Sequence, residues 1–111
     1  MNDLATKSCV PCRGGIPPLA EDERERLLDL LEEDWEIVNG HHLRREFPFL
    51  DFVSALAFTN AIGEIAEAEG HHPDILLTWG RVTVDIWTHK IDGLTESDFI
   101  LAAKVEQNLA S

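Results

Sequence analysis

The chain has 111 residues, of which 44% are hydrophobic and 27% charged, and its formal net charge at pH 7 is −12. This length suits one domain whose core needs no metal or disulfide staple, and the composition excludes a disordered or fibrous protein. The acidic charge argues against nucleic acid and anionic membrane surfaces as partners. Neither a membrane-spanning run nor the layout of a secretory signal occurs, so we expect a cytoplasmic protein.

The N-terminal segment differs in character from the rest of the chain. Residues 1–19 are predicted to form a flexible tail, because glycines and prolines between positions 14 and 18 interrupt any periodic pattern. Both cysteines, Cys9 and Cys12, lie in this segment as one Cys-x-x-Cys, which rules out a framework of several disulfides. Residues 20–111 are predicted to form a single domain.

Three elements are predicted before residue 48. Leucines at helical spacing indicate a helix over Glu21–Glu33. Two short extended runs follow, Trp35–Val38 and Leu43–Phe47, on either side of Asn39-Gly40. Asn-Gly favours a type I′ turn, in which both central residues have positive φ, so the two runs are predicted to pair as a hairpin.

The longest predicted helix covers Phe49–Glu69. Pro48 stands before its first turn, where proline is tolerated, and Gly70 stands just past its end. Apolar side chains recur along it at spacings of three and four residues. They predict a broad buried face made of Phe49, Phe52, Val53, Leu56, Ile62, Ile65 and Ala66.

Two more strands are predicted over Asp74–Trp79 and Arg81–Thr88, joined through Gly80 as an antiparallel pair. Successive side chains of a strand point to opposite faces of the sheet. The second strand therefore separates into two sets, with Val82, Val84 and Ile86 on one face and Thr83, Asp85, Trp87 and His89 on the other.

A last helix is predicted over Thr95–Leu109, because Thr95 and Asp98 form a Thr-x-x-Asp capping signature and apolar residues follow at helical spacing. Those expected to face inward are Phe99, Ala102, Ala103 and Val105. The order helix, strand, strand, helix, strand, strand, helix predicts an α+β domain, with three helices on one face of a four-stranded antiparallel sheet. The other face must be solvated, bind a ligand or join another subunit.

The five histidines occur as two adjacent pairs and one single residue. His41-His42 directly follow the predicted turn, and this exposed end of a hairpin favours a solvated structural role. His71-His72 lie between a helix end and a proline, in the kind of loop where a rigid scaffold holds catalytic groups. His89 ends a strand that returns toward the same region. These three histidines either converge on one site or are unrelated surface residues.

The stretch from residue 67 to residue 98 carries a longer pattern. An acidic residue, three free positions, His-His-Pro, an aromatic residue, a histidine and an aspartate follow one another as Glu67, His71, His72, Pro73, Trp79, His89 and Asp98. These seven positions resemble the signature of the pterin-4a-carbinolamine dehydratase family. The resemblance extends to Pro48-x-Leu50 and Gly93-Leu94-Thr95, and it covers most of the chain after about Pro18.

The resemblance implies a hydro-lyase of tetrahydrobiopterin recycling. Its substrate is 4a-hydroxytetrahydrobiopterin, a pterin carbinolamine that loses water to give quinonoid dihydropterin. Hydroxide is a poor leaving group at neutral pH, so an acid must protonate it, and a base must accept a proton from the cationic ring. Histidine side chains suit both tasks, since their unperturbed pKa is about 6.5. The reaction needs neither a metal nor a redox cofactor.

The resemblance also implies the site residues. His71, His72 and His89 are expected to be catalytic, with His71 and His89 as general acids and His72 orienting the substrate. Substrate binding is expected of Glu67, Pro73 and Trp79. Glu67, one helical turn before His71, either pairs with it or is one more exposed acid. Trp79 either walls the pterin site or belongs to the core.

Asp98 is expected to act as a helix cap and is given no part in the chemistry. A change of His41 to alanine is expected to leave both the fold and dehydration intact.

Two other interpretations remain open. The first is a zinc site of His71, His72 and His89, with or without Cys9 and Cys12, although adjacent histidines usually point apart and we expect no metal. The second is a non-catalytic binding module of the same fold, acting in transcription-factor dimerisation or RuBisCO assembly. By resemblance we also expect a homodimer or homotetramer.

Overall fold

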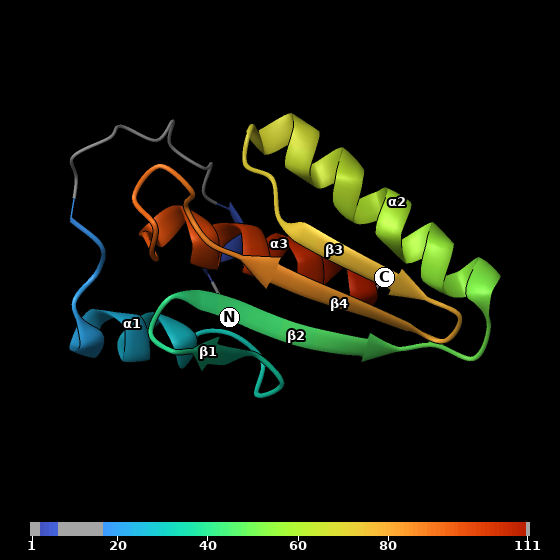
Figure 1. Ribbon diagram of the computed structural model, residues 1–111, viewed down its shortest axis with the longest axis horizontal. Helices are drawn as coiled ribbons and strands as arrows, with labels where there is room; N and C mark the ends of the chain where they lie inside the picture. Colours follow the sequence, from blue (N-terminus) through green and yellow to red (C-terminus); the bar gives the residue numbers. More distant parts are fainter. Residues whose placement is uncertain (1–2, 7–16, 111) are drawn as a thin grey trace.

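In the computed structural model, which describes residues 3–6 and 17–110, four strands form one antiparallel sheet in the order β1-β2-β4-β3 (Figure 1). The strands cover Glu36–Val38 (β1), His42–Pro48 (β2), Asp74–Thr78 (β3) and Arg81–Ile86 (β4). One face carries the three α-helices, which cover Glu21–Leu28 (α1), Phe52–Glu69 (α2) and Glu96–Ala110 (α3). The predicted α+β class and strand pairing are confirmed.

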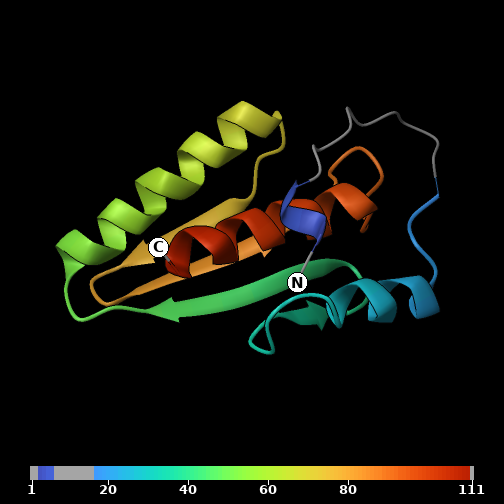
Figure 2. The same ribbon diagram turned by 180° about the vertical axis from the view of Figure 1, so that it is seen from behind.

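The buried core lies between the sheet and the helices. Val82, Val84 and Ile86 of β4 all point to the helix side and are fully buried, as the alternation predicts. Figure 2 shows α3 lying across this side of the sheet. The residues of α3 predicted to face inward are all buried, namely Phe99, Ala102, Ala103 and Val105.

The turn between β1 and β2 has the predicted geometry. Asn39 has a φ of 54° and Gly40 a φ of 66°, so both central residues are in the left-handed region that a type I′ turn requires. The backbone N–H of His41 donates to the carbonyl of Val38 at 2.9 Å and closes the turn. This turn sets where β2 starts, and therefore where His41 and His42 lie.

The start of α2 differs from the prediction. The helix begins at Phe52 rather than Phe49, because the side chain of Asp51 accepts a hydrogen bond from the backbone N–H of Ser54 at 2.8 Å and caps it. The N–H of Phe49 instead donates to the carbonyl of Gly80 at 2.8 Å, which keeps this residue at the end of the sheet. The end of α2 at Gly70, whose φ is 66°, is as predicted.

The buried face of α2 also differs from the prediction. Phe52, Val53 and Leu56 were expected inside, but they are 42%, 75% and 39% exposed. The helix carries apolar side chains on more than one stripe, and periodicity alone does not tell which stripe meets the sheet. The stripe that is buried consists of Ala55, Phe58, Ile62 and Ala66. The first half of α2 consequently presents apolar surface to solvent.

Helix α1 and strands β3 and β4 end before their predicted ends, whereas β2 and α3 run one residue past theirs. Helix α1 stops at Leu28 rather than Glu33, because the N–H groups of Leu30 and Leu31 bond three residues back and tighten the chain into turns. Strand β3 ends one residue early, at Thr78. Strand β4 ends at Ile86, and an isolated bridge follows it at Thr88 and Gly93.

A short 3₁₀ helix, η1 (Asp3–Thr6), precedes the first α-helix. Its Leu4 and Ala5 are buried in the core cluster, and Nζ of Lys104 on α3 donates to the carbonyl of Ala5 at 2.9 Å. These four residues, which belong to the segment predicted as a tail, thus contact α3 and the core. Cys9 and Cys12 lie outside the described residues.

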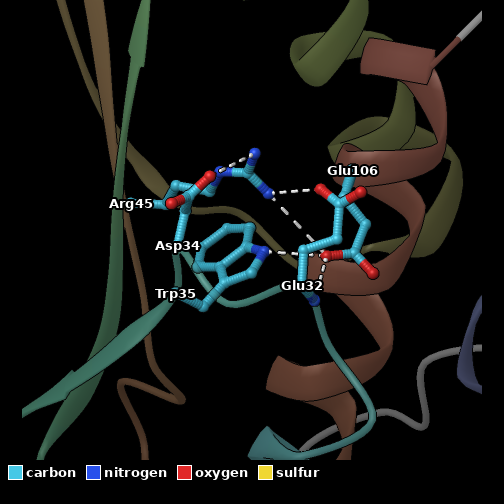
Figure 3. Close-up of polar contacts among 5 residues, drawn as sticks. All are labelled: Glu32, Asp34, Trp35, Arg45 and Glu106. Atoms are coloured by element: carbon cyan, nitrogen blue, oxygen red, sulfur yellow. Dashed lines mark hydrogen bonds and ion pairs between the residues drawn. The ribbon is translucent and has the colours of Figure 1, made fainter.

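A partly buried ionic cluster joins β2 to α3 (Figure 3). Arg45 is only 6% exposed, and its guanidinium donates to Glu32 at 2.7 Å and to Asp34 at 3.4 Å. Glu106 of α3 accepts from the indole N–H of Trp35 at 3.0 Å and from the backbone N–H of Glu32 at 3.1 Å. Burial raises the pKa of Glu106, whereas these two hydrogen bonds and the charge of Arg45 lower it.

We expect Glu106→Gln to remove a pH dependence from stability. Because the folded state raises the pKa of Glu106 above its usual 4.5, the folded chain binds this proton more tightly than the unfolded chain does. This contribution to the free energy of unfolding is present below about pH 4.5 and is lost as pH rises through the raised pKa. Urea unfolding over a pH series should show that decline in the wild type and a flatter course in Glu106→Gln. Identical pH profiles for the two proteins would contradict the assignment.

Candidate functional site

The three histidines singled out in the sequence lie at one end of the sheet, where β3 begins beside the end of β4 (Figure 1). His71 and His72 stand between α2 and the start of β3, and His89 follows β4. Strands β3 and β4 are antiparallel, with Asp74 opposite Asp85, so the start of one lies beside the end of the other. The three histidines line a single cleft of about 410 Å³ together with Gly70, Trp87, Thr88 and Lys90. This volume is within the usual range for small-molecule sites.

His71 is held by a buried carboxylate. Its Nε2 lies 2.6 Å from Oδ1 of Asp98, whose side chain is fully buried. The other oxygen of Asp98 accepts from the backbone N–H of Thr95 at 2.7 Å and from the hydroxyl of Thr88 at 2.8 Å. Because an ionised carboxylate only accepts hydrogen bonds, His71 donates through Nε2, which leaves Nδ1 to exchange a proton with a ligand.

Asp98 therefore has two tasks. The hydrogen bond from Thr95 confirms the predicted capping of α3. Its bond to His71 was not predicted, although the match of Asp98 to the family signature was a signal for it. A helix cap expected to be purely structural thus belongs to the immediate surroundings of the cleft.

Glu67 is paired with His72 and not with His71. Oε2 of Glu67 lies 2.5 Å from Nε2 of His72, and both side chains are largely exposed. The expected spacing of one helical turn to His71 does not apply, because Gly70 adopts a left-handed conformation and turns the chain away from the helix axis. A carboxylate on the last turn of α2 consequently orients the second histidine of the cleft.

His89 is held by an aromatic ring. Its imidazole stacks on the indole of Trp87, with ring centroids 4.2 Å apart and planes 16° apart. Trp87 was not predicted as a site residue, but the alternation along the strand had placed both residues on the same face. His89 is thus oriented by an indole, whereas His71 and His72 are each oriented by a carboxylate.

The pair His41-His42 is less exposed than predicted. The side chains of His41 and His42 are 33% and 16% exposed, and their rings lie 5.3 Å and 5.8 Å from that of Trp87. Pairing of β2 with β4 brings them there, since Leu43 stands opposite Ile86. Burial lowers the pKa of His42, and the carboxylate of Asp85 opposes this shift. His41 is thus partly solvated and His42 mostly buried, which differs from the expected solvated pair.

Pro73 and Trp79 do not line the cleft. Pro73 directly follows His72 and precedes β3. Trp79 follows the other end of β3, and the five residues of that strand separate it from the histidines by roughly 16 Å. Trp79 is also 70% exposed, so it does not belong to the core of the chain either.

Within residues 3–6 and 17–110, no group of three or more His, Cys, Asp or Glu side chains is arranged to hold a metal ion. A zinc site that includes Cys9 and Cys12 falls outside this range. No helix in the described part of the chain combines the length and the hydropathy needed to cross a membrane.

Comparison with known proteins identifies the family. Residues 17–108 match the family model described as pterin 4 alpha carbinolamine dehydratase, and the chain belongs to this family. A relative from Alkaliphilus metalliredigens is 57% identical over 107 residues, which cover 96% of each chain. One from Rubrobacter xylanophilus is also 57% identical, over 96% of this chain and 99% of its own. Both are named "Putative pterin-4-alpha-carbinolamine dehydratase".

Two solved structures share the fold. A transcriptional coactivator/pterin dehydratase from Brucella melitensis is 34% identical and superimposes with a TM-score of 0.76, covering 81% of this chain and 96% of its own. A pterin dehydratase-like protein, identified as a RuBisCO assembly factor in the alpha-carboxysome, has a TM-score of 0.62 over 72% of this chain and 94% of its own. At 22% identity, the second likeness shows the fold alone.

We expect Asp98→Ala to destabilise the fold and to release His71. It removes the acceptor for Thr95, Thr88 and His71, so the free energy of unfolding should fall by about 3 kcal/mol. Asp98→Asn keeps one oxygen to cap α3, so its free energy of unfolding should fall by less. Urea unfolding measures both losses, and ¹⁵N NMR of the His71 ring reports whether Nε2 still carries the proton. Equal stability of the wild type and Asp98→Ala would contradict this account.

Proposed function

We propose that this chain catalyses the dehydration of 4a-hydroxytetrahydrobiopterin to quinonoid dihydropterin, a hydro-lyase reaction in tetrahydrobiopterin recycling. The observation that carries the proposal is the cleft lined by His71, His72 and His89, in which each ring has its own neighbour to orient it. Membership of the family supplies the reaction class. The overall change is loss of water, so its atoms and electrons balance without a metal or a redox cofactor.

The chemistry needs an acid and a base at one ring. In the substrate one carbon bears the hydroxyl group and is bonded to a ring nitrogen. The nitrogen lone pair forms the C=N bond while the C–O bond breaks, and a protonated histidine donates to the departing oxygen, which leaves as water. The cationic ring then gives its N–H proton to a neutral histidine. Positioned proton transfer of this kind typically contributes about 10²–10⁴-fold in rate.

The residues divide these tasks in the proposal. His71 and His89 serve as general acids for a hydroxyl group on either face of the ring. His71 would act through Nδ1, since Asp98 engages its Nε2. His72, oriented by Glu67, binds and positions the substrate. For Pro73 and Trp79 the family resemblance is the sole support, because neither lines the cleft in this chain.

We also propose a cytoplasmic homodimer or homotetramer. Support for self-association comes from large apolar side chains that the chain exposes around the start of α2 and along β3 with its following turn. Scattered apolar residues are normal on a surface, whereas a concentration of them on adjoining segments is typical of a contact surface. The exposed residues are Leu50, Phe52, Val53, Leu56, Leu76 and Trp79.

We expect the wild-type protein to accelerate the decay of freshly generated 4a-hydroxytetrahydropterin well beyond the spontaneous rate. His71→Ala and His89→Ala should each reduce that acceleration by about 10²-fold, because each removes a positioned proton donor. The double variant should fall to the spontaneous rate. Stopped-flow absorbance follows the decay, and circular dichroism checks that the variants are folded. Glu25→Ala, an exposed change on α1, is the control and should keep full activity.

No acceleration by folded wild-type protein would overturn the dehydratase proposal. The family membership would then favour a non-catalytic binding module, and a search for protein partners would follow.

We expect sedimentation to show the wild type as a dimer or tetramer and Val53→Glu as a smaller species. Val53 is 75% exposed on α2, so a carboxylate there should leave the fold intact and disfavour burial in an interface. Ala20→Glu places the same charge before α1 and should leave the assembly unchanged. A monomeric wild type would contradict self-association, and dissociation by both variants would argue against an interface at α2.

A further inference from the structure

The histidines of the cleft differ in what holds them. His71 and His72 each have a carboxylate on Nε2. For His89, no hydrogen bond to a ring nitrogen occurs within residues 3–6 and 17–110, and its contact is the stack on Trp87. The orientation of His89 over the cleft therefore depends on how firmly Trp87 is held.

Trp87 in turn packs against the pair His41-His42. The ring of His41 lies 5.3 Å from the indole at an angle of 45°, and that of His42 lies 5.8 Å away at 53°. The two imidazoles meet edge to face, with their Nδ1 atoms 3.0 Å apart. A hydrogen bond between these atoms makes the two rings one unit, and this unit supports the indole from the β1–β2 turn.

The same unit also holds the loop that follows His89. Nε2 of His41 lies 2.7 Å from Oδ1 of Asp92. The backbone N–H of Asp92 donates to the carbonyls of Thr88 at 2.9 Å and of His89 at 3.2 Å, so Asp92 is fixed to the residues around His89. His41 thus contacts the His89 segment on both sides, through Trp87 before it and Asp92 after it.

The hydrogen-bonding roles follow from Asp92. Its carboxylate accepts, so His41 donates through Nε2, and in the tautomer that this bond selects Nδ1 accepts from the Nδ1–H of His42. Imidazole suits position 41 because its two nitrogens make hydrogen bonds in different directions from one rigid ring. Protonation of both rings would place two N–H groups face to face. Burial, which lowers the pKa of His42, works against that state.

We propose that His41, together with His42, is a positioning residue for His89: it fixes the imidazole over the cleft by holding Trp87 on one side and Asp92 on the other. The inference rests on the proposed dehydration, in which His89 is a general acid. It replaces the expectation from sequence that His41→Ala leaves dehydration intact, because that expectation assumed a solvated pair.

Asp92 offers a matched pair of variants. Its φ of 56° is in the left-handed region, which both glycine and asparagine tolerate. Asp92→Gly removes the carboxylate and frees His41, whereas Asp92→Asn keeps an oxygen that accepts from Nε2 of His41. Asn39→Gly is the control, since Asn39 lies in the adjacent turn at a φ of 54°.

We expect His41→Ala and Asp92→Gly each to lower kcat for dehydration by about 10-fold with little change in KM. A misplaced acid stabilises the transition state less, whereas binding of the substrate is affected little. The double variant should be about as slow as His41→Ala alone, since that change already removes the contact with Asp92. Asp92→Asn and Asn39→Gly should stay near the wild-type kcat. Wild-type kcat in both His41→Ala and Asp92→Gly would overturn the inference.

NMR tests the same connection without the reaction. The indole of Trp87 shifts the ring-proton signals of the stacked His89, and that shift should shrink in Asp92→Gly and His41→Ala but persist in Asp92→Asn. Unchanged His89 signals in both disruptive variants would overturn the inference, whether or not the wild type dehydrates the pterin. Loss of the shift in a protein without dehydratase activity would instead support the positioning and leave the proposed function as the part that failed.

Discussion

The rest of the site depends on the hydrogen bonds that the carboxylate of Asp98 accepts. A fully buried carboxylate is costly unless its oxygens are hydrogen-bonded, and here both are. One oxygen fixes the first turn of α3, through Thr95, and the segment just past the end of β4, through Thr88. The other oxygen reaches His71 at the end of α2. The group that stabilises the start of a core helix thus also sets the distance between two walls of the cleft.

The cleft combines two ways of orienting an imidazole. A carboxylate fixes both the ring plane and the tautomer, as for His71 and His72. A stacked indole fixes the plane and leaves both ring nitrogens of His89 without a partner among the described residues. In the proposed dehydration, which needs proton transfer on either face of a flat ring, this difference would give one acid with a single available nitrogen and another with two. A stacking contact orients a ring less strictly than a hydrogen bond does, and in the proposed arrangement the pair His41-His42 compensates by holding Trp87 in place.

Local signals in the sequence predicted most of the fold, whereas long-range pairing determined what they missed. The Asn39-Gly40 turn, the alternation along β4 and the Thr95 cap involve residues close in sequence, and all formed as expected. The buried stripe of α2 depends on which side meets the sheet. The surroundings of His41 and His42 depend on the register between β2 and β4. Likewise, the left-handed Gly70 redirected the chain so that the partner of Glu67 changed.

The ends of the sheet differ in character, and this bears on how one fold serves several roles. The histidine cleft lies where β3 begins, whereas the exposed Trp79 follows its end, near the start of α2. The hydrogen bond from Phe49 to Gly80 holds these last two segments, a region with exposed apolar side chains, next to each other. Substitutions of the cleft histidines would therefore leave that region untouched, and changes in the region would spare the histidines. Because fold alone does not define function, the histidine geometry, rather than the sheet and helices, is the feature that favours an enzyme over an assembly module.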